Sequence, residues 1–105
     1  MDPPAEVTAQ EAHAAVAGGG AFLLDVREPW EWRERRIPGA VLIPLVELPA
    51  RVEELPRDGD LYVHCRVGRR SRLAVDYLRQ TGRPRAVNVA GGIDAWEAAG
   101  LPVIR

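Results

Sequence analysis

Residues 61–72 read Leu61-Tyr62-Val63-His64-Cys65-Arg66-Val67-Gly68-Arg69-Arg70-Ser71-Arg72, and this stretch decides the fold class. Its first four residues are apolar and β-prone, which is the pattern of a central strand in a parallel sheet. Ser71 can cap a helix that follows, and the apolar positions of that helix would share one face: Leu73, Ala74, Tyr77 and Leu78. A strand, a short loop and a helix in this order indicate an α/β fold.

Cys65 lies where this architecture places chemistry, because ligands of open α/β sheets bind beyond the carboxyl ends of strands. Arg66, Arg69, Arg70 and the helix N-terminus should lower its thiol pKa from the usual value of about 8.5. Gly68 allows the loop to curl round the sulfur. We therefore expect a thiolate nucleophile that meets an anionic substrate. The alternative is a buried cysteine with only a structural role.

The other elements follow from capping and hydrophobic patterns. Thr8 and Glu11 form a capping box for a helix that should end near Ala17. We expect one domain over residues 1–105, with a disordered lead-in over Met1 to Pro4. The remaining predicted strands are Ala5–Val7, Ala21–Val26, Val41–Ile43 and Ala86–Val89, and the remaining helices are 28–34, 50–55 and one that reaches Ala99.

Polar and aromatic residues near these elements need partners or a packing role. Asp25 closes a buried strand, so it should either pair with a cation at the sheet edge or cap a turn. His64 precedes the nucleophile, but strand alternation points it to the opposite face, which favours a structural role. Trp30 and Trp32 cannot share one helical face, so we expect both to pack on the core, with the alternative that one of them borders a cleft.

The composition excludes several function classes. The net charge is −1 and no apolar run is long enough to cross a bilayer, so nothing favours nucleic acid or a membrane. A single cysteine excludes an internal disulfide and a Cys-x-x-Cys pair, and two histidines are too few for a metal cluster. No signal peptide is visible, and a reactive thiol suits the cytoplasm, which is the expected location.

Four motifs in order resemble the rhodanese family of sulfurtransferases. They are Cys65-Arg66-Val67-Gly68-Arg69-Arg70-Ser71, Asp25-Val26-Arg27-Glu28, Ile37-Pro38-Gly39-Ala40, and Gly91-Gly92 followed by Trp96, Gly100 and Pro102. Arg36 stands where rhodaneses often have histidine before the third motif. The resemblance agrees with a five-stranded, mainly parallel sheet with helices on both faces. The paired glycines should let their backbone approach another element closely, and we expect that element to be the active loop.

The resemblance also implies the chemistry. Cys65 would take a sulfane sulfur from thiosulfate or a similar donor as a persulfide and pass it to cyanide or a thiol. The loop residues Arg66, Val67, Gly68, Arg69, Arg70 and Ser71 would cradle the sulfur and bind the anion. Asp25 would lie near the loop and pair with Arg70, with Arg27 in support. This chemistry needs no metal or cofactor, and we expect a monomer.

Three alternatives remain beside thiosulfate transfer. The first is a relay protein that takes sulfur from a cysteine desulfurase. The second is a cysteine phosphatase, whose arginine would stand at position 71, where this chain has Ser71. The segment from Cys65 to Arg70 spans six residues, and by resemblance this shorter loop suits a sulfur atom better than a phosphoryl group. The third is a regulatory module without chemistry, although such modules commonly lack the cysteine.

Overall fold

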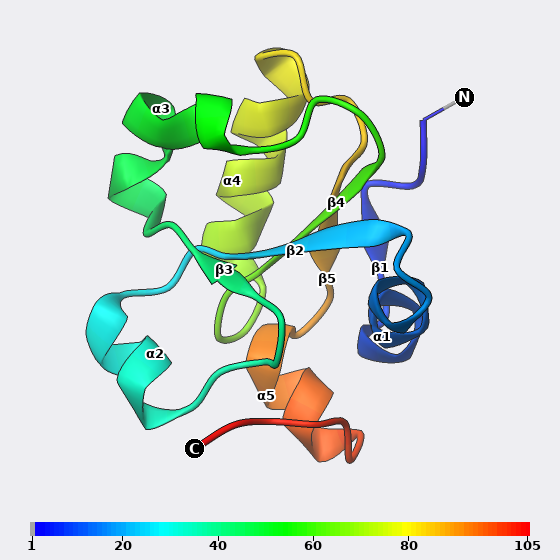
Figure 1. Ribbon diagram of the computed structural model, residues 1–105, viewed down its shortest axis with the longest axis vertical. Helices are drawn as coiled ribbons and strands as arrows, with labels where there is room; N and C mark the ends of the chain where they lie inside the picture. Colours follow the sequence, from blue (N-terminus) through cyan, green and yellow to red (C-terminus); the bar gives the residue numbers. More distant parts are fainter. Residues whose placement is uncertain (1) are drawn as a thin grey trace.

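The computed structural model describes residues 2–105 and has a five-stranded sheet with helices on both faces (Figure 1). The strand order is β1-β5-β4-β2-β3, and every neighbouring pair is parallel. The strands are β1 (Glu6–Val7), β2 (Ala21–Asp25), β3 (Val41–Leu42), β4 (Asp60–His64) and β5 (Ala86–Val89). The helices are α1 (Ala9–Ala17), α2 (Pro29–Glu34), α3 (Leu48–Arg51), α4 (Arg69–Gln80) and α5 (Gly92–Ala98), with 3₁₀ turns at Leu45–Glu47 and Val52–Glu54.

The central strands are apolar throughout because the sheet is covered on both faces. On β4, Leu61 and Val63 enter the core layer that contains Ala74 and Leu78 of α4. Tyr62 points to the other layer, which contains residues of α1 and α5. Successive side chains of a strand alternate between faces, so each central strand supplies both layers. The prediction of a parallel sheet with two helical layers is confirmed.

The start of α4 differs from the prediction that Ser71 caps it. The N-cap is Gly68, whose φ of 102° lies in the left-handed region that glycine adopts readily. The helix therefore begins at Arg69, and Ser71 lies in its first turn with a fully buried side chain. The buried face also differs from the prediction: Val75 packs on the sheet, whereas Leu73 is 63% exposed, so the expectation for Leu73 was wrong.

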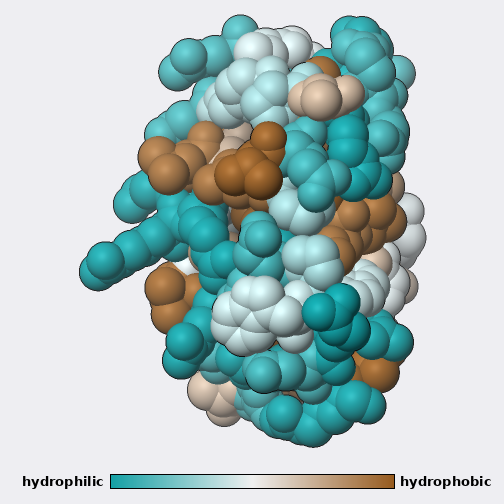
Figure 2. Space-filling view, turned by 90° about the vertical axis from the view of Figure 1, so that its left-hand side faces the viewer, coloured by the Kyte–Doolittle hydropathy of each residue, from teal (hydrophilic) through white to brown (hydrophobic). Residues whose placement is uncertain are grey.

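The N-terminal segment and the molecular surface agree only in part with the predictions from the sequence. The predicted edge strand is present as β1. The predicted lead-in includes Met1, which lies outside the described residues, and the carbonyl of Pro3 accepts a hydrogen bond from Arg79. Trp30 is 57% exposed and does not pack in the core; it borders a cavity, which was the alternative given for one of the two tryptophans. Figure 2 shows apolar surface in separate patches on the side formed by α2 and α3. No helix in residues 2–105 is long and apolar enough to cross a membrane.

Two leucines of α4 provide a test of this packing. Leu78 is fully buried, so Leu78→Ala should lower the free energy of unfolding by about 2–5 kcal/mol. Leu73→Ala is the matched control on the exposed face and should change it by no more than about 0.5 kcal/mol. Equilibrium unfolding in urea measures both variants. Equal losses of stability would contradict the placement of Leu78 on the buried face and Leu73 on the exposed face of α4.

Candidate active site

The carboxyl ends of β2 and β4 place the polar residues of the site. Asp25 and His64 are register partners at the ends of these strands, and Cys65 follows directly. Residues 65–68 then turn into α4. Both the strand order and the direction of the strands thus bring Cys65 to the edge that the sequence predicted.

The thiol of Cys65 lies under a set of hydrogen-bond donors. Its Sγ accepts the backbone N–H of Gly68 at 3.1 Å and the Ser71 hydroxyl at 3.3 Å. Burial alone would raise the pKa of the Cys65 thiol. The Ser71 hydroxyl and the backbone N–H groups of Ser71, Gly68 and Val67 outweigh burial and lower that pKa. Cys65 is only 1% exposed, so a reacting group must be small or must enter the loop with a narrow end.

The first turn of α5 orients one of these donors, the N–H of Val67. The N–H of Ile93 donates to the carbonyl of Cys65 at 2.9 Å, and the N–H of Asp94 donates to the carbonyl of Arg66 at 3.1 Å. In a trans peptide the carbonyl and the next N–H point in opposite directions. The loop carbonyls therefore point towards α5, and the N–H of Val67 points towards the sulfur.

Gly92 makes this approach possible. Its φ is +57°, and an added Cβ would lie 2.3 Å from the Cys65 carbonyl oxygen and 2.5 Å from that of Arg66. Real Cβ atoms do not approach backbone oxygen so closely. The prediction that the paired glycines allow close contact with the active loop is confirmed for Gly92.

Asn88 is a site residue that the sequence analysis missed. Its Oδ1 lies 2.5 Å from the Ser71 hydroxyl, and its Nδ2 donates to the Gly68 carbonyl at 3.3 Å and to Glu6 at 2.8 Å. Asn88 therefore ties the loop to β5. The available signal was a lone polar residue in an otherwise apolar strand, which in a buried position needs partners.

The predicted pair of Asp25 and Arg70 does not form. Asp25 instead binds Arg27, with Nη2 to Oδ2 at 2.8 Å, and both residues are buried. Arg27 lies only two residues after Asp25, so its guanidinium is within hydrogen-bond distance of the carboxylate. Arg70 donates two hydrogen bonds to Glu31, at 2.7 and 2.8 Å. Glu31, which the sequence analysis did not single out, is thus the partner of Arg70.

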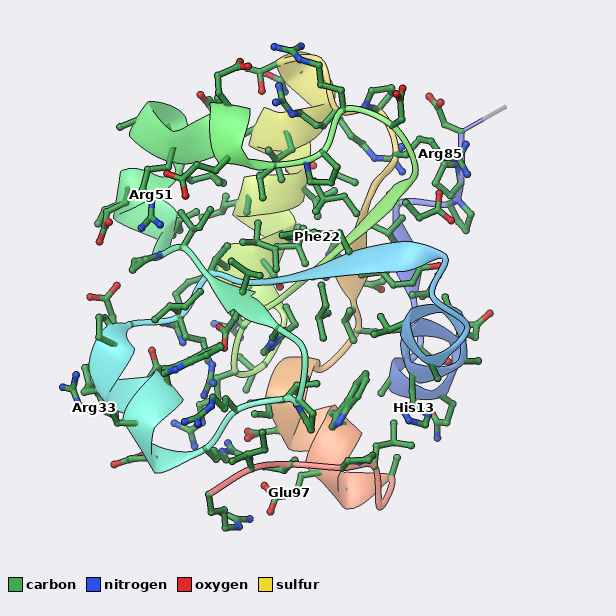
Figure 3. The ribbon with its side chains drawn as sticks, viewed as in Figure 1. His13, Phe22, Arg33, Arg51, Arg85 and Glu97 are labelled. Atoms are coloured by element: carbon green, nitrogen blue, oxygen red, sulfur yellow. The ribbon has the colours of Figure 1, made fainter. Side chains whose placement is uncertain are left out.

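α2 carries Glu31 to the loop. Arg27 donates to the Arg35 carbonyl at 2.7 Å and approaches the Glu31 carbonyl at 3.5 Å, which ties the carboxyl end of α2 to β2. Glu31 is buried, whereas Arg33 of the same helix points outward from the molecule (Figure 3). Hydrogen bonds from Arg70 are the main reason that the pKa of Glu31 is lowered to about 2, although burial opposes the shift.

The other two loop arginines point away from the sulfur. Arg66 is 64% exposed, and its Nε lies 3.5 Å from Asp94. Arg69 is exposed and has no ion pair within the described residues. The predicted activation of Cys65 by arginines is therefore corrected: hydroxyl and backbone N–H donors are its main cause.

His64 lies on the opposite side of the strand from the thiol. Its Nδ1 is 3.2 Å from the Cys65 carbonyl, and its Nε2 is 3.6 Å from Asp25 without a hydrogen bond. Burial lowers the pKa of His64 despite the opposing charge of Asp25, so the ring is neutral at pH 7. This position agrees with the structural role predicted for His64.

A cavity of about 230 Å³ lies beside the loop. Arg66 of the loop and Glu31, the partner of Arg70, both line it. Its lining residues are Arg27, Trp30, Glu31, Glu34, Arg35 and Arg66.

Comparison with protein families matches residues 8–99 to the rhodanese-like domain. The chain belongs to the rhodanese-like family. A solved rhodanese-related protein from Thermoplasma volcanium has a TM-score of 0.87 and 35% identity, with 94% of this chain and 96% of that chain covered. The human single-domain sulfurtransferase has a TM-score of 0.84 and 27% identity, with 91% and 97% covered.

Curated sequences include relatives named for sulfur chemistry. This rhodanese-like chain is 43% identical to a sulfurtransferase of Allochromatium vinosum, over 79% of the chain and 78% of the relative. It is 39% identical to a putative sulfur carrier protein of Bacillus subtilis, over 70% of the chain but only 40% of that longer protein. The relatives therefore indicate the sulfurtransferase class. The sulfur donor and acceptor must be inferred from the chemistry of the site.

Gly92→Ala tests the contact between α5 and the loop. The new Cβ would collide with two backbone oxygens, so the free energy of unfolding should fall by at least about 3 kcal/mol. Gly100→Ala is the control, because Gly100 also has a positive φ but no atom within 4 Å of the added Cβ. It should cost only about 1 kcal/mol. Urea unfolding compares the two, and similar losses would argue against the close approach.

Glu31 gives a prediction about acid stability. Its pKa is lowered on folding, so its contribution is complete above pH 4.5 and is lost as the pH falls towards 2. Because Arg70 is 36% exposed, we expect a loss on the order of 2 kcal/mol. The measurement is the difference in unfolding free energy between wild type and Glu31→Gln across this range, with the exposed Glu34→Gln as control. A difference for Glu31→Gln that does not shrink with acid would contradict the assignment.

Proposed function

We propose that this rhodanese-like protein moves a sulfane sulfur from a small donor to a thiophilic acceptor through a persulfide on Cys65. The observation that carries the proposal is the position of the Cys65 sulfur, which lies under the Ser71 hydroxyl and the Gly68 N–H at the end of β4. These donors favour the thiolate, which is the reactive form of cysteine. The family relatives named as sulfurtransferases support the reaction class.

The reaction has two balanced steps. The Cys65 thiolate attacks the outer sulfur of thiosulfate, the S–S bond of the donor breaks, and sulfite leaves with the electron pair. Cyanide or a thiolate then attacks the outer sulfur of the Cys65 persulfide, which restores the thiolate and releases thiocyanate or a new persulfide. The loop N–H groups stay aimed at the sulfur through both steps and stabilise its negative charge.

The other site residues act on the position of the loop. In this proposal the carried sulfur lies within the backbone of Arg66, Val67, Gly68, Arg69, Arg70 and Ser71, while the side chains of Arg66 and Arg69 point outward. Asp25 and Arg27 support them indirectly, because Arg27 joins β2 to the end of α2 and so holds Glu31 against Arg70. No step requires a metal or a cofactor. We place the reaction in the cytoplasm and assign it to a monomer.

A relay role is the second candidate. The similarity to a putative sulfur carrier protein favours it, since such a protein passes sulfur onward. The same persulfide on Cys65 would serve, with a protein such as a cysteine desulfurase as donor. The two candidates differ only in the partner that loads the sulfur.

Cys65→Ser tests the proposal. Incubation of the wild type with thiosulfate should add one sulfur at Cys65, which is the only cysteine in the chain, and cyanide should then yield thiocyanate. The serine variant should lose the added mass and at least about 1,000-fold in turnover, because a hydroxyl cannot form the persulfide. Mass spectrometry and a thiocyanate assay measure both. Turnover that survives in Cys65→Ser would end the proposal.

A further inference from the structure

The charges around the thiol are nearly balanced, although the loop is rich in arginine. Arg70 is paired with Glu31, Arg27 with Asp25, and Arg66 with Asp94. Arg35, on the far side of the cavity, is paired with Asp94 and Glu97. Of the three loop arginines, only Arg69 has no ion pair within residues 2–105. The strongly positive site expected for a dianionic donor is therefore largely neutralised.

We propose that Glu31 is a specificity-determining residue: by occupying Arg70, it selects an organic persulfide over thiosulfate as the sulfur donor. The inference rests on the proposed sulfur transfer through Cys65 and names its donor class. Thiosulfate carries two negative charges and releases sulfite, which carries two as well. A small-molecule persulfide brings less charge to the transferred sulfur and releases a thiolate.

The pairing with Glu31 prevents Arg70 from binding a dianion. Both terminal nitrogens of Arg70 donate to Glu31, one to each carboxylate oxygen. This two-point pairing uses the guanidinium face that would otherwise bind an oxyanion. Glu31 cannot move aside easily, because its side chain is only 7% exposed and Arg27 anchors the end of α2. The low pKa of Glu31 keeps the carboxylate charged at neutral pH.

The adjacent cavity suits the organic part of such a donor. Its volume of about 230 Å³ is below the range of about 300–1,000 Å³ typical of drug-sized ligands, so the donor must be small. Arginine and glutamate side chains both line it, together with the half-exposed indole of Trp30. Glu34 is the only charged lining residue without an ion pair within residues 2–105, and its carboxylate can bind the ammonium group of an amino-acid persulfide.

The step with a persulfide is balanced without a further reagent. The Cys65 thiolate attacks the outer sulfur of R–S–SH, and the S–S bond of the donor breaks. The electron pair and the proton leave with R–SH, while the outer sulfur remains on Cys65 as a persulfide anion. No net oxidation occurs, because the sulfane sulfur only changes its carrier.

Cysteine persulfide and thiosulfate are the two donor probes. We expect wild type to show the higher kcat/KM with cysteine persulfide. Glu31→Gln should shift the ratio of the two kcat/KM values towards thiosulfate by about tenfold, which equals about 1.4 kcal/mol. Asp76→Asn removes an exposed carboxylate of α4 that neither lines the cavity nor contacts Arg70, and it should shift the ratio by less than about twofold because exposed charges are screened.

The outcomes separate the inference from the proposed function. A wild type that prefers thiosulfate, or an equal shift in Asp76→Asn, would overturn the role of Glu31 while leaving sulfur transfer intact. No sulfur on Cys65 from either donor would overturn the proposed function and this inference together.

A second measurement probes the electrostatic potential around Cys65 without any sulfur donor. The thiol is alkylated with neutral iodoacetamide or anionic iodoacetate, and the ratio of the two rates reports the local potential. Wild type should give a ratio within about twofold of a free thiol, and Glu31→Gln should favour iodoacetate by about tenfold more. A wild-type ratio already strongly in favour of iodoacetate would overturn the inference, and this result does not depend on how the variant folds.

Discussion

The hydrogen bonds from the first turn of α5 to the carbonyls of Cys65 and Arg66 govern the site. A loop that follows a strand has peptide groups that can face either way. Binding the Arg66 carbonyl to α5 leaves the N–H of Val67 facing the sulfur, where it favours the thiolate together with the N–H of Gly68. This contact requires a residue without a side chain at Gly92, since a Cβ would overlap the carbonyl oxygens.

The number of arginines suggests a strongly positive site, but their main role is to hold the loop, α2 and β2 in position. Arginines dominate the loop, yet a carboxylate from another element neutralises most of them. Their value lies in geometry, because Arg70 and Glu31 join the loop to α2, and Arg27 joins α2 to β2. Buried ion pairs of this kind add little net stability but specify one arrangement of the elements around them.

Much of the fold was predictable because it depends on local patterns. The Thr8–Glu11 capping box and the apolar strands are set by neighbouring residues, and each was found within a few residues of its predicted place. The start of α4 could not be predicted in the same way, because Ser71 and Gly68 are both acceptable N-cap residues in isolation. The cap at Gly68 is chosen by the contacts of Ser71 with Cys65 and Asn88, which bury its hydroxyl.

The sequence by itself determined the parallel α/β architecture, the place of Cys65 at a strand end and the glycines that admit a close backbone contact. Only the tertiary structure decided which donors reach the sulfur and which carboxylate each arginine binds. Asp25 bound Arg27 and not the expected Arg70, and Glu31 had no local signal of its role. The physical reason is that side-chain reach and burial select among chemically equivalent partners, and most of these partners are distant in sequence.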